Sequence, residues 1–175
     1  GAPDARRRHG PPAAERKPVS TIFFIRHGQA SFGTRDYDRL SALGREQAAC
    51  LGEYLARLGV SFDAVYSGSL RRQTETAEIA MGALEAGGPA ASVQVLADFD
   101  EYDSGGVFKA LLADLIEEDP GLSGRLPRVL TDPKEFQAIF EEMVTRWVDG
   151  RNRRPVAETW TQFTQRVGRG VLQVM

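Results

Sequence analysis

The sequence predicts an α/β domain with three layers, α/β/α, around a mainly parallel sheet. Three observations lead to this fold class. Short β-branched apolar runs alternate with longer stretches of helical periodicity between residues 19 and 96, which is the order expected of βαβ units. After residue 96 the apolar residues recur at helical spacing only. A length of 175 residues, with 42% hydrophobic and 26% charged residues, suits one globular domain with its own core.

The first half of the chain is expected to contain three strands and two helices. The strands are predicted at 19–25, 60–66 and 93–96, where the runs are short and rich in Val, Ile and Phe. Ser41 is a suitable cap for a helix over 41–58, and Gly59 follows at its end. Ser69 is expected to open the second helix, which ends at the Gly-Gly-Pro of residues 87–89.

Cys50 is predicted to be a core thiol, because it falls on the apolar side of the first helix. Cysteine nucleophiles that sit in an oxyanion-binding loop have an arginine six positions later, and Ala56 occupies that position here. A cysteine-based mechanism is therefore not expected.

The second half is expected to be a helical insertion, residues 104–155, that arches over the strand ends, followed by a last helix. A helix is predicted over 107–118 and a loop over 121–131. Asp132 and Pro133 then begin a further helix as its cap and first residue. The apolar faces of the last two helices are expected to be core: Phe136, Ile139, Phe140, Met143, Val144, Trp147 and Val148 in one, Trp160, Phe163, Val167, Val171 and Val174 in the other.

Residues 1–18 are expected to form a flexible tail, with residues 19–175 as the domain. The tail holds four prolines, and its five basic residues outnumber two acidic ones. Such a segment buries too little apolar surface to offset the entropy of ordering it.

Composition excludes several classes of protein. The net charge of −2 gives no electrostatic basis for general nucleic-acid binding. A single cysteine permits neither an intrachain disulfide nor a cysteine-rich zinc site. We see no membrane-spanning run and no secretion signal, so we expect no membrane association and a cytoplasmic location. Gly168-Arg169-Gly170 lacks the third glycine of a dinucleotide fingerprint and follows no strand.

Two predicted strand ends carry side chains suited to an anion. Arg26, His27 and Gly28 follow the first strand, and Arg71 and Arg72 follow the second at the start of a helix. Ligands bind beyond the carboxyl ends of parallel strands, and a helix N-terminus attracts anions. Arginine offers a planar fork of donors for phosphate oxygens, and imidazole can be a nucleophile or a base. We expect the imidazole and two guanidinium groups to converge on one tetrahedral anion.

These residues resemble the histidine phosphatase superfamily, the phosphoglycerate-mutase-like branch 1. The resemblance rests on Arg-His-Gly-Gln at 26–29 with Leu-Ser-Ala-Leu-Gly-Arg-Glu-Gln-Ala at 40–48, and on Tyr-Ser-Gly-Ser-Leu-Arg-Arg at 66–72 with Glu-Thr-Ala at 75–77. It is close from residue 21 to about residue 80 and looser from there to residue 175.

The resemblance implies a role for each matching residue. His27 would attack phosphorus and form a phosphohistidine, while Arg26, Gln29 and Arg72 would bind the phosphoryl oxygens. Glu101 is the expected general acid, with Asp98, Asp100 and Asp103 as open alternatives. Neither a metal nor another cofactor is implied.

The sequence departs from the family in two places. Gly33, followed by Thr34, stands where many members have a substrate-binding asparagine. The family also has a second histidine on a later strand, whereas this chain contains only His9 and His27. We therefore expect the C-terminal part of the domain to be missing, or the strand and its site residue to be absent from this variant.

The function that these expectations favour is a metal-independent phosphatase acting on a small phosphorylated substrate or a phosphoprotein. Two alternatives stay open. One is a phosphate-binding scaffold of the same fold with a degenerate site, and the other is a phosphotransferase of the phosphoglycerate-mutase type.

Overall fold

A computed structural model describes residues 20–31, 38–85, 92–129 and 131–175. The predicted tail at 1–18 lies outside these ranges, as do His9 and the positions of Gly33 and Thr34.

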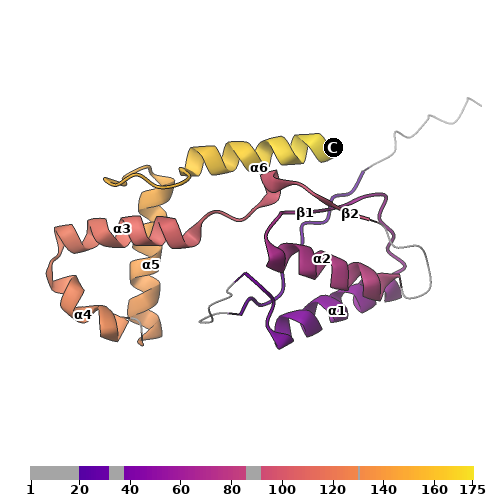
Figure 1. Ribbon diagram of the computed structural model, residues 1–175, viewed down its shortest axis with the longest axis horizontal. Coiled ribbons are helices and arrows are strands. Elements are labelled where there is room, and N and C mark those ends of the chain that lie inside the picture. Colours follow the sequence, from indigo (N-terminus) through magenta and orange to yellow (C-terminus); the bar gives the residue numbers. More distant parts are fainter. Residues whose placement is uncertain (1–19, 32–37, 86–91, 130) are drawn as a thin grey trace, which may run out of the picture.

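In the first half of the chain, the described residues form two helices and two parallel strands (Figure 1). Helix α1 spans Ala42–Arg57, β1 Val65–Ser67, α2 Arg71–Leu84 and β2 Val93–Val95. The strands pair in parallel with Val65 opposite Val93. These elements confirm the α/β class with a parallel sheet, while the three-layer arrangement stays a prediction.

The ends of α1 follow the predicted signals. The Ser41 hydroxyl accepts a hydrogen bond from the Gly44 N–H at 3.0 Å, as an N-cap does. Beyond the other end, Gly59 has φ +67°, a conformation that glycine adopts without a steric penalty.

The predicted strand at 19–25 is wrong for the residues that the structure describes. Residues 20–25 belong to no strand, and the apolar side chains there are exposed, Phe24 by 76%. A chain segment becomes a strand only when a neighbouring strand pairs with its backbone. In the described residues the ladder joins only β1 and β2, so this segment lacks that partner.

Other predicted boundaries also need correction. The second strand begins at Val65 rather than residue 60, and α2 begins at Arg71 rather than at Ser69.

Cys50 is exposed and is not a core thiol. The side of α1 that packs on α2 instead carries small residues, because Gly52 lies against the Ala80 carbonyl and leaves no room for a side chain.

The insertion consists of three helices rather than two. Helix α3 spans Ser104–Glu118, α4 Gly121–Val129 and α5 Pro133–Val148, so the predicted loop at 121–131 is wrong. Leu122 and Val129 lie two turns apart in α4 and are both buried, and this tertiary packing outweighs the glycines and Pro127. The Asp132 carboxylate caps α5 by accepting from the N–H groups of Lys134 and Glu135, as predicted.

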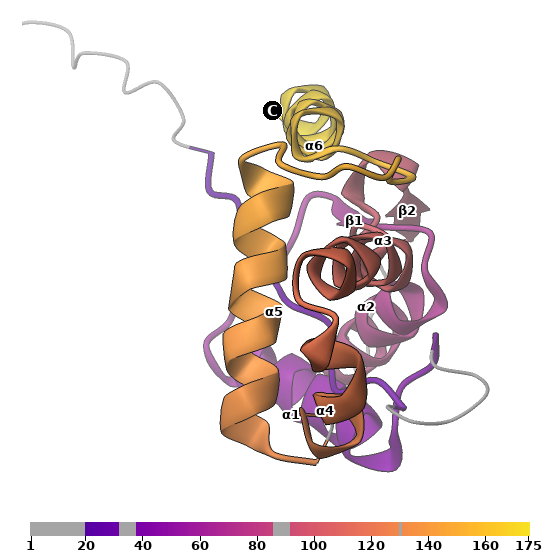
Figure 2. The ribbon, with the colours of Figure 1, turned by 90° about the vertical axis from the view of Figure 1, so that its left-hand side faces the viewer.

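The core of this helical group lies between α3 and α5. Val107 and Leu111 of α3 pack with Met143 and Trp147 of α5. Figure 2 shows α5 beside α3 and α4. Val148, the last residue of the predicted apolar face, is exposed.

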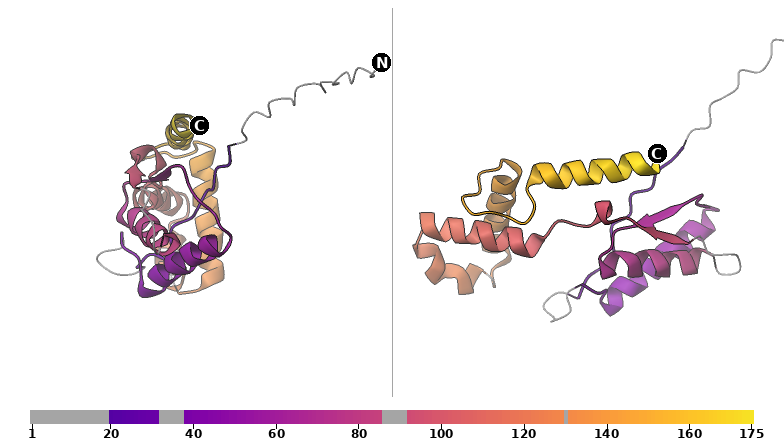
Figure 3. Two further views of the ribbon diagram at one scale, coloured as in Figure 1. Left: turned by 90° about the vertical axis from the view of Figure 1, so that its right-hand side faces the viewer. Right: turned by 45° about the horizontal axis from the view of Figure 1, so that its top comes forward.

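Helix α6, Trp160–Val174, connects the two halves of the molecule. It begins beside the α3–α5 group and runs along the top of the molecule toward β1 and β2 (Figures 1 and 3). Beneath α6 the short 3₁₀ helix η1, Ala97–Phe99, follows β2. Gly170 of α6 lies against Phe99 so closely that a Cβ atom would collide with the ring.

Candidate active site

The loop that carries His27 is fixed by close backbone contacts. The Gly28 N–H donates to the Thr76 hydroxyl at 3.0 Å, and that hydroxyl donates to the Arg72 carbonyl at 2.7 Å. Gly28 also lies against Gly44 of α1, where a Cβ on either residue would meet backbone. The imidazole is therefore held by a loop that is bonded to both helices.

The hydrogen bonds of His27 assign its tautomer. The Gly28 carbonyl lies 2.7 Å from Nδ1, and because a carbonyl only accepts, Nδ1 carries the hydrogen. Nε2 lies 3.3 Å from Arg72 Nε, which donates to it, and 3.3 Å from Glu101 Oε2. Neutral His27 thus presents the lone pair of Nε2 to the arginine.

Arg72 is the centre of the cluster. Its side chain is only 7% exposed, and Nη2 donates to Glu101 Oε2 at 2.7 Å while Nη1 donates to Asp38 Oδ1 at 2.7 Å. Burial acts to lower the pKa of Arg72, but the hydrogen bonds to the two carboxylates outweigh it and raise the pKa. The guanidinium therefore keeps its charge beside the imidazole.

Glu101 lies beside both His27 and Arg72. A hydrogen bond from protonated His27, supported by the one from Arg72, lowers the pKa of Glu101 to about 2, although burial acts in the opposite direction. The same bond to Glu101 raises the pKa of His27 against the effect of its own burial. In this state the carboxylate is ionised and occupies the arginine donors that an anion would use.

The other predicted site residues do not join this cluster. Arg26 is exposed, and no hydrogen bond or ion pair links it to His27, Arg72 or Glu101 in the described part of the chain. Gln29 uses its backbone N–H on Gln47 and its side-chain oxygen on Ser41. The structure thus brings one of the two expected guanidinium groups to the imidazole.

The three alternative acids have other partners. Asp98 pairs with Arg169, Asp103 caps α3, and Asp100 accepts from the backbone N–H and hydroxyl of Ser69. Glu101 alone among these four carboxylates contacts His27 in the described residues. This arrangement favours Glu101 as the acid.

Two residues that the sequence analysis did not single out support the cluster. Arg166 of α6 donates from Nη1 to the carbonyl oxygens of Ala97, Asp98 and Asp100, just before Glu101. Asp38 binds Arg72 from the opposite side. Both act across long sequence separations, and no local motif marks them.

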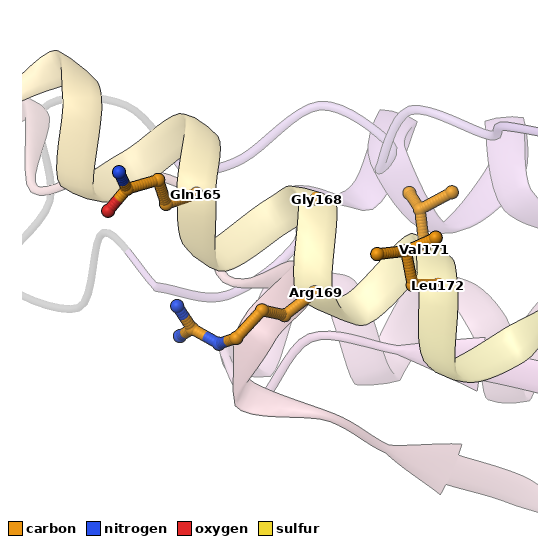
Figure 4. Close-up of a pocket in the computed structure, with 5 residues that line it drawn as sticks. All are labelled: Gln165, Gly168, Arg169, Val171 and Leu172. Atoms are coloured by element: carbon orange, nitrogen blue, oxygen red, sulfur yellow. The ribbon is translucent and has the colours of Figure 1, made fainter.

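The surface also has a shallow hollow that is lined by residues of α6. Figure 4 shows its lining residues, which are Gln165, Gly168, Arg169, Val171 and Leu172. None of these side chains is a nucleophile or a carboxylic acid. The cluster at the start of α2 is therefore the candidate active site.

Two further findings concern metal binding and membrane insertion. The described residues contain no group of three or more His, Cys, Asp or Glu side chains that could hold a metal ion. No helix among them has the length and apolar character needed to cross a membrane.

A parallel α/β fold with an imidazole, a guanidinium and a carboxylate gathered beyond its strands is typical of enzymes that handle phosphoryl groups.

Comparison with known proteins defines the family. The model of the histidine phosphatase superfamily, branch 1, matches residues 22–149, which is more than half of the chain. The chain belongs to this superfamily.

Curated relatives match a shorter region. Serine/threonine-protein phosphatase PGAM5, mitochondrial, of Xenopus laevis is 45% identical over 67 residues, covering 36% of this chain and 24% of the relative. The Caenorhabditis briggsae protein of that name is 37% identical over 81 residues, covering 46% and 28%, and the human one is 43% identical over 65 residues, covering 36% and 22%.

The matched region thus spans about a quarter of the length of these relatives. No solved structure matches the chain. Together the family and its relatives support a phosphatase-type enzyme. The cytoplasmic location expected from the sequence stays a prediction.

Proposed function

We propose that this protein hydrolyses phosphomonoesters through a phosphohistidine formed at Nε2 of His27. The observation that carries the proposal is the meeting of Nε2 with the Arg72 guanidinium and the Glu101 carboxylate, each within 3.3 Å. These three groups are the nucleophile, the charge-stabilising donor and the acid that phosphoryl transfer requires. The full three-layer fold of the family is part of the same proposal.

The first step would transfer the phosphoryl group to the enzyme. The Nε2 lone pair attacks phosphorus, the bond between phosphorus and the ester oxygen breaks, and that oxygen takes a proton from Glu101. The Gly28 carbonyl accepts from Nδ1 and so stabilises the positive charge that develops on the ring. Arg72 stabilises the charge on the transferring group.

The second step would release phosphate. Water attacks the phosphorus of the phosphohistidine and gives a proton to the Glu101 carboxylate. The bond from phosphorus to Nε2 then breaks, which returns the lone pair to the imidazole and the proton to Glu101. The imidazole lone pair and the Glu101 proton are then as they were before the first step.

Substrate binding would prepare Glu101 to act as an acid. In the resting site its pKa is about 2, because His27 and Arg72 hold the ionised form. A phosphate group that takes over the Arg72 donors removes part of this stabilisation and adds negative charge nearby. Both changes raise the pKa of Glu101, since a like charge disfavours ionisation.

Arg72 and the N-terminus of α2 can together supply the positive field at the site. Metal independence is therefore part of the proposal. The relatives are named as serine/threonine-protein phosphatases, which supports phosphoserine or phosphothreonine in a protein as the substrate class. Such alkyl esters have poor leaving groups, so they place a greater demand on the general acid than aryl phosphates do.

The test measures phosphate release from an aryl phosphate and from a phosphoserine peptide, with and without a chelator. We expect turnover that the chelator leaves unchanged, and a loss of more than about 10⁴-fold in His27→Ala, beyond what acid–base assistance alone provides. Glu101→Gln should lose about 10²–10⁴-fold on the peptide and less on the aryl ester. Equal rates for wild type and His27→Ala would refute the proposal, and binding of phosphate without turnover would favour a scaffold role.

A further inference from the structure

One carboxylate, that of Asp38, binds both the backbone and the catalytic side chain of the first turn of α2. Its Oδ1 accepts from Arg72 Nη1 at 2.7 Å, and its Oδ2 accepts from the Arg71 backbone N–H at 2.9 Å. The two oxygens therefore tie the Arg72 side chain to the backbone of its own helix.

The contact of Oδ2 has a structural role. Leu70, the N-cap of α2, provides no side-chain hydrogen bond, so Asp38 supplies an acceptor for a first-turn N–H group from outside the helix. A negative charge is also favourable at a helix N-terminus. This role explains one oxygen of the carboxylate but not the other.

The contact of Oδ1 sets the direction of the guanidinium. A guanidinium is planar, so fixing Nη1 also fixes where Nε and Nη2 point. In Arg72 these two nitrogens point at His27 Nε2 and Glu101 Oε2. Asp38 thus binds Nη1, the nitrogen of the guanidinium that faces away from the reacting groups.

The charge of Asp38 works against substrate binding. A carboxylate beside the arginine that binds an anionic phosphate reduces the attraction between them. Asp38 therefore benefits the reaction only through the orientation of Arg72. Orientation affects the transition state more than the ground state.

We propose that Asp38 is a positioning residue that sets the guanidinium plane of Arg72 for phosphoryl transfer. This inference rests on the proposed phosphatase function. It assigns to Asp38 an effect on kcat rather than on substrate affinity.

Asp38→Asn separates the two roles. An asparagine oxygen caps a helix about as well as an aspartate, so it can still accept from the Arg71 N–H. Its amide NH₂ then faces Arg72 Nη1, and two donors cannot bond to each other. We expect kcat to fall by about tenfold to a hundredfold without an increase in KM, and thermal stability to change little.

Asp132→Asn is the matched control. Asp132 caps α5 by accepting from two backbone N–H groups, and it lies in the helical insertion away from the site. This variant should keep the kcat and KM of the wild type. A kcat for Asp38→Asn equal to that of Asp132→Asn would overturn the inference.

A second measurement does not depend on activity. In ¹⁵N spectra of the arginine side chains, an oriented guanidinium shows separate Nη signals because its rotation is slow. We expect separate signals for Arg72 in the wild type, and faster exchange between them in Asp38→Asn and Asp38→Ala, where the guanidinium keeps its bonds to His27 and Glu101 but loses the one to Asp38. Unchanged signals in these variants would contradict positioning by Asp38. If the wild type releases no phosphate, the proposed function fails, and this comparison still decides the role of Asp38.

Discussion

The two nitrogens of His27 have different environments, and this difference gives the residue its chemistry. Nδ1 is committed to the Gly28 carbonyl, while Nε2 lies between Arg72 and Glu101. Protonated His27 can donate from Nε2 to Glu101, but only the neutral form has the lone pair that attack on phosphorus requires. In the proposed mechanism, the pKa of His27 therefore sets the lower pH limit of the activity.

Glu101→Gln should lower the pKa of His27. The hydrogen bond to Glu101 is the largest cause that raises this pKa above 6.5, and burial, which lowers it, would remain. The chain has two histidines, so an NMR titration can follow each ring. We expect His27 to titrate above 6.5 in the wild type and at a lower pH in the variant. The same pKa in both proteins would show that Glu101 does not interact with His27 in solution.

The signs of the two pKa shifts also fix how this pair affects stability. The raised pKa of His27 contributes stability below pH 6.5, which is lost as the pH rises through the folded-state value. The lowered pKa of Glu101 contributes stability above 4.5, which is lost as the pH falls toward about 2. Both contributions are present together between about pH 4.5 and 6.5.

The pattern of strands and helices singled out His27 and Arg72, and the resemblance to the histidine phosphatase superfamily added Glu101. The structure brings these three residues together. Arg26 has the same position in the pattern, but it is exposed, as residues 20–25 before it are. Asp38 reaches Arg72 from a separate loop, and no periodicity or cap signal marks such a contact.

At the level of elements, α6 anchors the segment that carries Glu101. The Arg166 guanidinium donates to three carbonyl oxygens in and just after η1, those of Ala97, Asp98 and Asp100. It also forms an ion pair with Glu158. From the other side, Asp100 is bonded to Ser69 before α2. Glu101, the proposed acid, is therefore positioned by two helices that lie far apart in the sequence.

Arg166→Ala should destabilise this segment. The three carbonyls share the single nitrogen Nη1, so we count them as about one hydrogen bond to a charged group, which contributes about 1.5–3 kcal/mol. We therefore expect a loss of about 2–3 kcal/mol in the free energy of unfolding. Urea unfolding measures this loss, and faster hydrogen exchange at the Phe99 and Asp100 amides should accompany it.

Arg169→Ala is the control for that variant. Arg169 lies on the same helix, but its side chain is 64% exposed and its ion pair with Asp98 is worth less than about 1 kcal/mol. Equal stability of the two alanine variants would show that Arg166 does not anchor the segment.

Helices were easier to predict than strands for a physical reason. A helix bonds within itself, so caps such as Ser41 and Asp132 mark its ends locally. A strand depends on a partner elsewhere in the chain, and the apolar run at 22–25 did not reveal whether one is present. Helix α4 was missed because the burial of Leu122 and Val129 depends on α3 and α5.

At the scale of the whole molecule, two groups of elements contribute to one site. The α1–α2 half supplies His27 and Arg72, and the chain between β2 and α3 supplies Glu101. Helix α6 runs along the top of the molecule in Figure 1 and bonds to the second of these parts. The strand-end residues predicted that His27 and Arg72 would meet, but not that Arg26 would stay outside the cluster, and the packing of the helical end group depended on tertiary contacts.

The central claim is that His27 carries the phosphoryl group during turnover. Glu101→Gln with an aryl phosphate tests it most directly, because the first step then needs little acid while the second lacks its base. After a short reaction quenched with alkali, peptide mass spectrometry and ³¹P NMR should show one acid-labile phosphate on Nε2 of His27. Release of phosphate by an enzyme that never carries phosphate on His27 would contradict the account.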